Sequence, residues 1–257
     1  MNTDLATRAR FAGELARSAG TLARRYFRRE IAFTREAKGL QDWVSEADRD
    51  VESTIRGAIA RAYPGESMFG EEEGGDIGDR TWFVDPIDGT LNFVHGVRYW
   101  CVSIAFVERG ERKVGAIYDP ELDELFVAVR GGGARCNGDP IAVSQCSSLG
   151  ESLIVNGHVP RHEMEAHLRL RRSLLAAGCA VKDMGAGALM LAHVAAGRYD
   201  AFIEPHMNPW DALAGLLLVE EAGGRTRPYP AAGLAAGGPV VAAATGVFDA
   251  LTRMTDA

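Results

Sequence analysis

The N-terminal part of the chain carries a helical pattern of apolar positions. Leucine, tyrosine and several alanines recur every three or four residues across residues 5–29, with arginines and acids between them, and this period predicts an amphipathic helix. Its apolar stripe is mostly alanine, which favours packing on a core over binding to a membrane surface. A second helix is predicted after Ser45, because Ser45 and Asp48 match a capping box and apolar residues follow at helical spacing through residues 51–59.

Beyond the second helix the pattern changes to short apolar runs bounded by glycine, proline and acidic turns, which predicts strands. One short strand is expected at residues 67–69 and another at residues 82–84. Three further runs follow one another through short turns, so we expect them to form an antiparallel meander of residues 100–107, 113–118 and 124–129.

From about Asn137 strand-like and helix-like segments alternate along the chain. Strands are expected at residues 153–156, 180–182 and 199–203, and helices at residues 161–177, 185–194 and 212–222. Such alternation predicts an α/β arrangement for the second half. The N-terminal α+β half, residues 1–136, and the C-terminal α/β half, residues 137–257, have no repeat or low-complexity linker between them, so we expect residues 1–257 to form a single unit.

Composition narrows the class of protein. The 257 residues carry a formal charge of −7, which argues against nucleic acid or an anionic membrane as the main partner. The four cysteines are widely spaced and form no Cys-x-x-Cys motif, so we expect reduced thiols and neither disulfides nor a zinc site. No apolar run approaches ~20 residues and the N-terminus is rich in charges, which predicts a cytoplasmic protein without a membrane segment.

The strongest chemical signal follows the apolar run at residues 82–84. Two carboxylates, Asp85 and Asp88, stand three residues apart, and Pro86 stiffens the turn between them. Carboxylates and a backbone carbonyl are hard oxygen ligands that suit Mg²⁺ or Mn²⁺. Gly89 allows a ligand to approach the backbone closely, and the helix start that follows favours an anion. The pattern therefore indicates phosphoryl chemistry.

Simpler interpretations of this motif stay open at the level of the residues. Asp-Gly is also an ordinary turn, and Asp88 is suited to cap the helix that follows it. The Asp-x-Asp-Gly-Thr motif of haloacid-dehalogenase-type phosphatases, by contrast, has one residue between its acids, whereas two intervene here. The motif is therefore a different one.

Other acids and glycines fit either a site or local structure. Asp48 and Asp211 both fall in first helical turns, where an acid favours the helix dipole. Glu71 follows the strand at residues 67–69, and neighbouring strands lie about 4.8 Å apart, so Glu71 and Asp85 can hold one ion if these strands pair. The run Gly185-Ala186-Gly187 suits close ligand approach at a helix start, although tight packing explains it equally well.

These signals occur together in one order and resemble the inositol monophosphatase family of Mg²⁺-dependent, lithium-sensitive phosphatases. The resemblance rests on Asp48, on Gly-Glu-Glu at residues 70–72, on Asp-Pro-Ile-Asp-Gly-Thr at residues 85–90 and on Pro-Trp-Asp at residues 209–211, and it spans residues 38–224. It implies a layered α/β sandwich of alternating α-β-α-β-α layers that acts as a single catalytic unit. It also implies a homodimer.

The resemblance further implies a role for each residue of the motifs. Two or three Mg²⁺ ions, or Mn²⁺, would be held by Glu71, Asp85, the carbonyl of Ile87, Asp88 and Asp211. Catalysis would use Glu71 together with Asp48 and Thr90, which would orient and help to deprotonate a metal-bound water. Phosphate and substrate would be held by Asp88, Gly89, Thr90, Gly185, Gly187 and Glu204. Lys38 and Glu72 are further candidates, Lys38 at a spacing from Asp48 that differs from that of the family.

The implied reaction is hydrolysis of a phosphate monoester, and myo-inositol monophosphate is the expected substrate. Leu91-Asn92-Phe93-Val94-His95-Gly96 after the central motif resembles the inositol-phosphatase branch. Histidinol-phosphate phosphatase and then fructose-1,6-bisphosphatase are the alternatives, and a non-catalytic regulatory binding protein is the alternative from another class. Many relatives have Gly-Ser-Ala or Gly-Thr-Ala where this chain has Gly185-Ala186-Gly187, so a side-chain hydroxyl near the substrate is missing.

Overall fold

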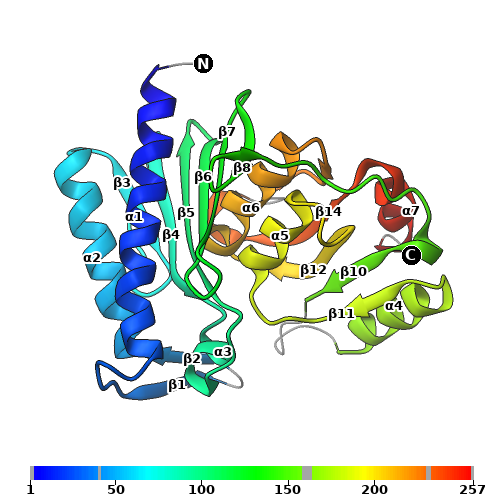
Figure 1. Cartoon of the computed structure of the whole chain (residues 1–257), viewed down its shortest axis with the longest axis horizontal. Coiled ribbons are helices and arrows are strands. Elements are labelled where there is room, and N and C mark those ends of the chain that lie inside the picture. The colour runs from blue at the N-terminus through cyan, green and yellow to red at the C-terminus, as the bar shows by residue number, and fades with distance from the viewer. Residues whose placement is uncertain (1–2, 40–41, 158–163, 230–232, 256–257) are drawn as a thin grey trace.

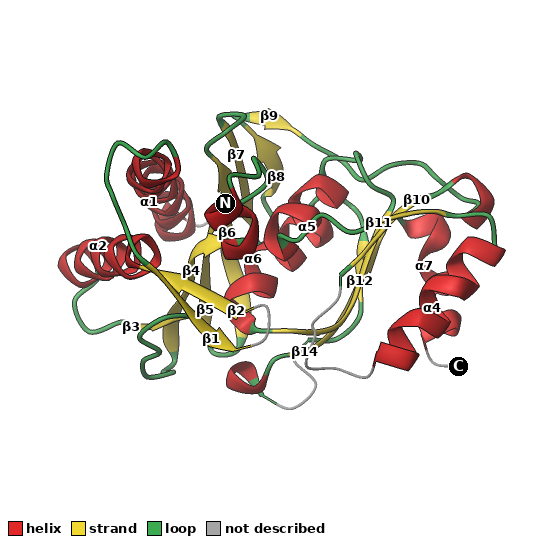
Figure 2. Cartoon of the chain, turned by 90° about the horizontal axis from the view of Figure 1, so that it is seen from below, coloured by secondary structure: helices red, strands yellow, loops and turns green. Residues whose placement is uncertain are grey.

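Helices and two β-sheets alternate in layers across the molecule (Figure 1). The computed structural model describes residues 3–39, 42–157, 164–229 and 233–255. Helices α1 and α2 cover the outer face of a seven-stranded sheet, and α5 and α6 lie between that sheet and a five-stranded one. Helices α4 and α7 cover the far face of the second sheet (Figure 2). The expected α-β-α-β-α sandwich is confirmed.

The described part of the chain contains seven α-helices and two short 3₁₀ helices. The α-helices are α1 Thr3–Phe27, α2 Glu46–Ala62, α3 Thr90–His95, α4 Met164–Ala176, α5 Gly187–Ala195, α6 Pro209–Glu221 and α7 Thr245–Thr255. The 3₁₀ helices are η1 Leu149–Glu151 and η2 Leu234–Ala236. Within the described residues, no helix is both long enough and apolar enough to span a bilayer.

The strands of the described residues form three groups. The seven-stranded sheet has the order β3-β4-β5-β6-β7-β8-β9, with β3 Ser67–Gly70, β4 Arg80–Asp88, β5 Cys101–Glu108, β6 Glu111–Asp119, β7 Glu124–Val129, β8 Gly133–Cys136 and β9 Asp139–Pro140. The five-stranded sheet has the order β11-β10-β12-β14-β13, with β10 Leu153–Asn156, β11 Ala180–Lys182, β12 Ala201–Met207, β13 Arg225–Thr226 and β14 Gly238–Ala243. A separate hairpin pairs β1 Arg35–Gly39 with β2 Asp42–Ser45.

The alanine stripe of the first helix packs against the seven-stranded sheet. Ala12, Ala16, Ala19 and Ala23 are fully buried, and their small side chains let α1 lie close to β6 and β7. A Cβ added to Gly20 would lie 2.5 Å from the Tyr118 ring, so the contact leaves no room for a larger residue. The predicted amphipathic helix is therefore confirmed as a core-packing helix.

Strand β4 departs from the predicted pattern because it continues through the proline. The sequence suggested a strand over residues 82–84 that ended in a turn, but β4 extends to Asp88. Asp85 pairs with Ser103 and Asp88 with Cys101, so β4 uses one more residue than β5 over this interval. This β-bulge absorbs the extra residue, and it replaces the expected turn.

The antiparallel meander is confirmed for β5, β6 and β7. In the second sheet, β10, β11 and β12 are parallel as the α/β alternation predicts. Strand β12 runs on to Met207, so Glu204 lies inside a strand and not at its end as expected. Strand β14 and helix α7, which complete the second half, were not predicted from the sequence.

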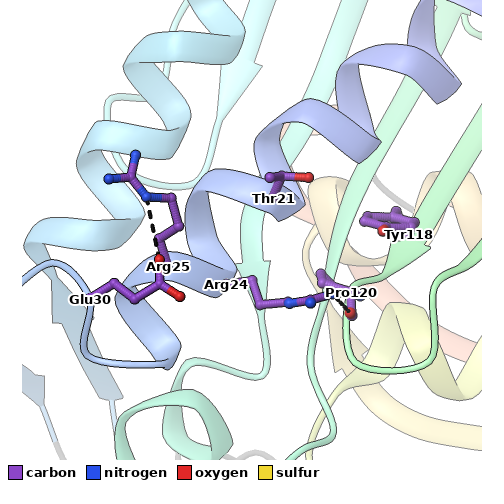
Figure 3. A pocket seen from close by; sticks show the side chains of 6 residues that line it. All are labelled: Thr21, Arg24, Arg25, Glu30, Tyr118 and Pro120. Atoms are coloured by element: carbon purple, nitrogen blue, oxygen red, sulfur yellow. Dashed lines mark hydrogen bonds and ion pairs between the residues drawn. The ribbon is translucent and has the colours of Figure 1, made fainter.

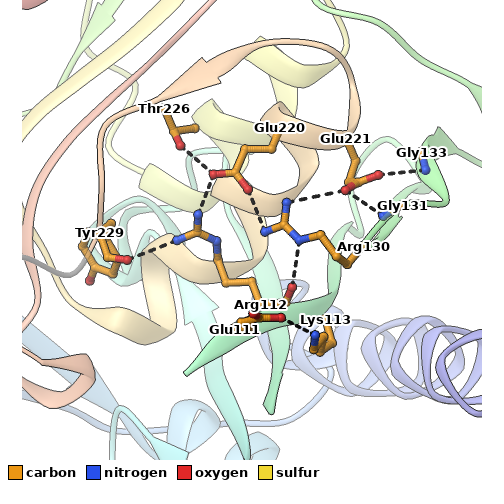
Figure 4. Close-up of polar contacts among 10 residues, drawn as sticks. All are labelled: Glu111, Arg112, Lys113, Arg130, Gly131, Gly133, Glu220, Glu221, Thr226 and Tyr229. Atoms are coloured by element: carbon orange, nitrogen blue, oxygen red, sulfur yellow. Dashed lines mark hydrogen bonds and ion pairs between the residues drawn. The ribbon is translucent and has the colours of Figure 1, made fainter. Parts of the chain in front are cut away.

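A polar network joins the C-terminal end of α6 to the seven-stranded sheet (Figure 4). Glu220 accepts hydrogen bonds from Arg112 and from the Thr226 hydroxyl, and Arg130 pairs with it at 2.8 Å. Glu221 accepts the backbone N–H groups of residues 131 and 133 at 2.9 and 3.0 Å. Because α6 carries Asp211 in its first turn, these contacts fix the helix that presents this acid.

Candidate metal centre

Three carboxylates converge where the ends of β3, β4 and α6 meet. Glu71 directly follows β3, Asp85 lies in β4, and Asp211 lies in the first turn of α6. Their ligand oxygens all lie within 4.8 Å of one another. Asp85 is buried, whereas Glu71 and Asp211 are partly exposed. Acids that are far apart in the sequence thus form one cluster.

The parallel pairing of β3 with β4 explains how Glu71 reaches Asp85. Gly70 pairs with Val84, and the Glu71 N–H donates to the Val84 carbonyl at 3.2 Å. The two acids therefore leave neighbouring strands at the same level, as expected from the sequence. Gly70 leaves room for α2 at this point, because an added Cβ would lie 2.3 Å from a carboxylate oxygen of Glu52.

Asp88 is held by the N-terminus of α5. Its Oδ1 accepts the Gly187 N–H at 3.1 Å, and its Oδ2 accepts the Ala188 N–H at 2.8 Å. The Leu189 N–H and the Cys101 thiol also donate to Oδ2, at 3.3 and 3.5 Å. Backbone N–H groups at a helix start stabilise a carboxylate. The interpretation of Asp88 as a cap for the helix that follows it is therefore wrong, because it caps α5.

Asp48 joins the start of α2 to the start of α3. The predicted capping box is present: the Ser45 N–H donates to Asp48 Oδ2 at 2.8 Å, and the Ser45 hydroxyl donates to the same oxygen at 2.5 Å. Oδ1 of Asp48 accepts the Thr90 hydroxyl at 3.2 Å, and this hydroxyl also lies 3.0 Å from the Ile87 carbonyl. Burial raises the pKa of Asp48, although the hydrogen bonds from Ser45 and Thr90 lower it.

Gly89 lies where three segments meet. Its φ is +90°, a left-handed conformation that glycine adopts without strain. A Cβ at this position would lie 2.9 Å from the Ala186 Cβ and 3.1 and 3.2 Å from the carbonyl oxygens of Tyr99 and Gly185. The start of α3 and the loop before α5 therefore approach each other closely because residue 89 has no side chain.

Glu204 enters from the second sheet. Its Oε2 lies 3.8 Å from the position that a Cβ on Gly187 would take, and 2.1 Å from that of a Cβ on Gly157. Burial raises the pKa of Glu204 well above its usual value, and the charges of Asp211 and Asp88 raise it further. Glu204 therefore stands beside the start of α5, within the electrostatic field of the cluster.

Burial and mutual repulsion raise the pKa of the clustered carboxyl groups. Burial, followed by the charges of Glu71 and Asp211, raises the pKa of Asp85 well above its usual value. Burial, followed by the charge of Asp211, raises the pKa of Asp88 to about 7. Burial raises the pKa of Asp211 to about 6.

The donor set fits a divalent cation. Within the described residues, no lysine or arginine forms an ion pair with Asp85, Asp88 or Asp211. Desolvated carboxylates without a counter-charge repel one another, and a bound cation removes that repulsion. Because the donors are all oxygens, the chemistry of the cluster suits Mg²⁺ or Mn²⁺ better than zinc.

The structure places only one of the two further candidates from the sequence. The side chain of Lys38 lies outside the described residues. Glu72 is not among the clustered carboxylates of the described chain; its backbone N–H donates to Glu52 Oε2 at 2.8 Å.

Two supporting residues were missed by the sequence analysis. Glu52 is fully buried, accepts the N–H groups of residues 72 and 73, and pairs with Arg56 at 2.7 Å. It lies one helical turn after Asp48, and an acid at that spacing on a buried face was the available signal. Asn92 donates to the carbonyls of Tyr99 and Met184, each at 2.8 Å, and no sequence pattern pointed to this role.

The fold and the cluster together define a layered α/β protein with an acidic centre able to hold a divalent cation. The chain belongs to the inositol monophosphatase family, whose model matches residues 4–253. The family is generally metal-dependent, which agrees with the acidic cluster.

Curated relatives carry two kinds of name. The chain is 42% identical over 218 residues to a protein of Pseudomonas aeruginosa called Nus factor SuhB, covering 81% of this chain and 80% of that protein. It is 42% identical over 192 residues to an inositol-1-monophosphatase of Mesorhizobium japonicum, covering 73% of this chain and 72% of the relative. Family membership therefore supports a phosphatase, while the first name belongs to a protein described by another role.

Solved structures show the same fold. The extragenic suppressor protein SuhB of Bartonella henselae superposes with a TM-score of 0.87 at 34% identity, covering 94% of this chain and 95% of that one. The inositol monophosphatase of Thermotoga maritima superposes with a TM-score of 0.87 at 33% identity, covering 97% of each chain.

Proposed function

We propose that this protein is a Mg²⁺-dependent phosphomonoesterase that hydrolyses a polyol or sugar monophosphate, with myo-inositol monophosphate as the first candidate. The observation that carries the proposal is the cluster of Glu71, Asp85 and Asp211, whose ligand oxygens lie within 4.8 Å of one another. The family match over residues 4–253 supports the same chemistry. We further propose that residues 1–257 act as one catalytic unit, as a homodimer, in the cytoplasm.

Each acid has a place in this proposal. Glu71, Asp85 and the carbonyl of Ile87 would hold one cation, and Asp85, Asp88 and Asp211 would hold a second. When bound, the cations would supply a lowered pKa for an attacking water and stabilisation of the leaving oxygen. Mn²⁺ is an alternative ion, because it takes the same oxygen ligands.

The remaining residues of the chain position groups and move a proton. The Thr90 hydroxyl lies 3.2 Å from Asp48 Oδ1, so it can pass a proton from water to a carboxylate whose pKa burial raises. The backbone N–H groups of Gly89 and Thr90 hold the phosphate. Asp88 and Glu204, with the backbone of Gly185 and Gly187, meet the substrate hydroxyls.

A substrate panel tests the proposal. Release of inorganic phosphate from myo-inositol 1-phosphate, histidinol phosphate and fructose 1,6-bisphosphate is measured with Mg²⁺ and with EDTA. We expect Mg²⁺-dependent turnover that is highest with inositol phosphate. The Asp211→Asn variant should lose turnover and keep its circular dichroism spectrum. Normal turnover by that variant would refute the two-metal assignment.

One observation favours a second candidate, a non-catalytic regulatory binding protein. The match with this chain covers 80% of the length of the relative called Nus factor SuhB. Under this alternative the fold is kept and the acidic centre is silent. Absence of Mg²⁺-dependent turnover of every substrate in the panel, with Mg²⁺ binding intact, would favour it over the phosphatase.

A further inference from the structure

In the part of the chain that the structure describes, a smaller and a larger cavity of different character lie outside the carboxylate cluster. The smaller, of about 280 Å³, is at the C-terminal end of α1 (Figure 3). Its cations already have partners: Arg24 donates to the Pro120 carbonyl at 3.1 Å, and Arg25 lies 3.6 Å from a carboxylate oxygen of Glu30. This surface pocket has no buried polar atom, among the described residues, that lacks a partner.

The larger cavity, of about 550 Å³, lies between the five-stranded sheet and the helices α4 and α7. Its volume falls within the usual range for small-molecule sites. Leu170, Ile203 and Val241 contribute apolar walls. None of the acids assigned to the metal centre lines this cavity, although Glu204 borders it from β12. It is therefore a separate space that touches the edge of the candidate centre.

A buried acceptor in the wall of this cavity has no partner. Asn156 is fully buried, and its Nδ2 donates to the carbonyls of Ile203 and Gly157 at 3.2 and 3.4 Å. These two acceptors fix the orientation of the amide, and its Oδ1 then has no hydrogen-bond partner among the described residues. A buried acceptor without a partner costs free energy, so a donor supplied by a ligand in the cavity would offset that cost.

The charged residues of the lining indicate the charge of a ligand that the cavity could bind. Arg227 and Arg169 line the cavity, and Glu204 is the single acid in the described lining. The Arg227 guanidinium donates to the Thr252 carbonyl at 2.9 Å, which holds it between α7 and the sheet. Arg169 is exposed on α4 and lines the cavity. Guanidinium groups bind phosphate and carboxylate through paired N–H donors.

We propose that the cavity between α4 and the five-stranded sheet binds a small amphiphilic anion. The anionic group lies toward Arg169 and Arg227, and the apolar body packs on Ile203 and Val241. A hydroxyl or N–H group of the ligand donates to Asn156 Oδ1. Phosphate and carboxylate compounds share this chemistry. The proposal does not depend on phosphatase activity, because its residues are not those of the metal centre.

Fluorescence titration with 8-anilinonaphthalene-1-sulfonate tests the site, because this probe is an aromatic anion with one N–H donor. The titration is run on the full chain in EDTA, so that no divalent cation is present. We expect saturable binding of one probe per chain. Ala166→Trp places a large side chain in the cavity lining and Arg169→Glu reverses a lining charge. Each should weaken binding by about ten-fold or more.

The same helix offers matched controls. Ala176 and Arg172 are exposed on α4 and do not line the cavity. Ala176→Trp and Arg172→Glu should therefore keep the affinity within about two-fold. Equal losses in each variant and its control, or binding that does not saturate, would refute the proposal.

Competition then distinguishes the two anion sources. Phenyl phosphate and mandelate both carry an apolar ring, and each should displace the probe if its anionic group is accepted. Benzyl alcohol keeps the ring and hydroxyl without the charge, so it should compete far more weakly. Displacement by benzyl alcohol as strong as that by both anions would overturn the assignment of Arg169 and Arg227 as the anion-binding groups.

Discussion

At the scale of single residues, Asn92 connects two segments that are distant in the sequence. Its amide donates to the Tyr99 and Met184 carbonyls at 2.8 Å each, and thereby ties α3 to the loop before α5. We predict that Asn92→Asp, which keeps the shape but removes both donors, lowers the free energy of unfolding by about 1–3 kcal/mol. It should also lower kcat/KM, because both segments flank Gly89.

Urea unfolding and steady-state kinetics check this prediction. Asn137→Asp is the matched control, since Asn137 donates to the Asp123 carbonyl at 2.9 Å on the far edge of the sheet. The control variant should keep the wild-type kcat/KM. If Asn92→Asp leaves kcat/KM unchanged as well, Asn92 has only a structural role.

Glu52 supports the loop that carries Glu71 without belonging to the cluster. It is fully buried and accepts the N–H groups of Glu72 and Glu73 at 2.8 and 3.1 Å. We predict that Glu52→Gln weakens Mg²⁺ binding, measured by isothermal titration calorimetry, and lowers the free energy of unfolding by about 1–3 kcal/mol. The NH₂ of glutamine faces a backbone N–H and loosens the loop.

The control for this variant is the same substitution at a surface ion pair. Glu108 accepts from Arg80 at 2.8 Å in an exposed position. Glu108→Gln should change the free energy of unfolding by less than about 1 kcal/mol. A Mg²⁺ affinity equal to that of the wild type in Glu52→Gln would show that the loop does not depend on this carboxylate.

Residue type explains which parts of the centre the sequence could predict. Glu71, Asp85 and Asp211 carry chemistry in their side chains, and the spacing of motifs marks them. Glu52 and Asn92 act on backbone N–H and carbonyl groups that only the folded chain brings near, so no local pattern identifies them.

At the scale of elements, regular patterns were easier to predict than the irregular ones. The strands at residues 124–129, 153–156 and 180–182 have the bounds that the apolar runs predicted. Strand β4 does not have its predicted bounds, because its bulge lets a proline-containing segment continue as a strand. Strand β14 pairs with β12 across a long interval of sequence, and such non-local pairing leaves no period to detect.

Helix α5 carries a buried histidine that gives the fold a pH dependence. The Arg198 guanidinium lies 3.1 Å from His193 Nε2, and the Tyr99 hydroxyl lies 3.4 Å from Nδ1. Burial, and then the charge of Arg198, lowers the pKa of His193 to about 4. The unfolded chain protonates near its ordinary value of about 6.5, so the unfolded state binds more protons between these pH values.

Because the unfolded state binds more protons in this range, the contribution of His193 to stability should be lost as the pH falls. Relative to His193→Gln, the wild type should lose about 2–3 kcal/mol of unfolding free energy between pH 7 and pH 4.5. Urea unfolding of both proteins at the two pH values measures the difference, and the carboxylates common to both cancel. Equal pH dependence in both proteins would contradict a buried, neutral His193.

At the scale of the whole molecule, the layers concentrate charge at one place. The seven-stranded sheet supplies Asp85, the inner helix α6 supplies Asp211, and the second sheet supplies Glu204. Each of these acids occupies an ordinary position in its strand or helix. Only the stacking of the layers brings the three carboxylates together. A family resemblance across the chain predicted this convergence better than any single motif did.

The repulsion within the cluster predicts opposite effects of one substitution with and without metal. Metal-free Asp85→Asn should unfold at a higher temperature than the metal-free wild type, because it removes a carboxyl group whose ionised form is disfavoured by burial and by the charges of Glu71 and Asp211. Asparagine keeps an oxygen for the Ile87 N–H, which donates to Asp85 Oδ1 at 2.9 Å. The substitution therefore keeps this backbone contact while it removes the carboxyl group.

Mg²⁺ should reverse this order. At about 100 times its Kd, a ligand stabilises the folded state by about 2.7 kcal/mol, so the wild type should gain Tm on addition of Mg²⁺ and Asp85→Asn should gain far less. Scanning calorimetry in EDTA, in MgCl₂ and in NaCl of matched ionic strength separates specific binding from screening. If NaCl raises the wild-type Tm as much as MgCl₂ does, the acids repel one another but do not bind Mg²⁺ specifically. A metal-free Asp85→Asn less stable than the wild type would show that other contacts already offset the repulsion.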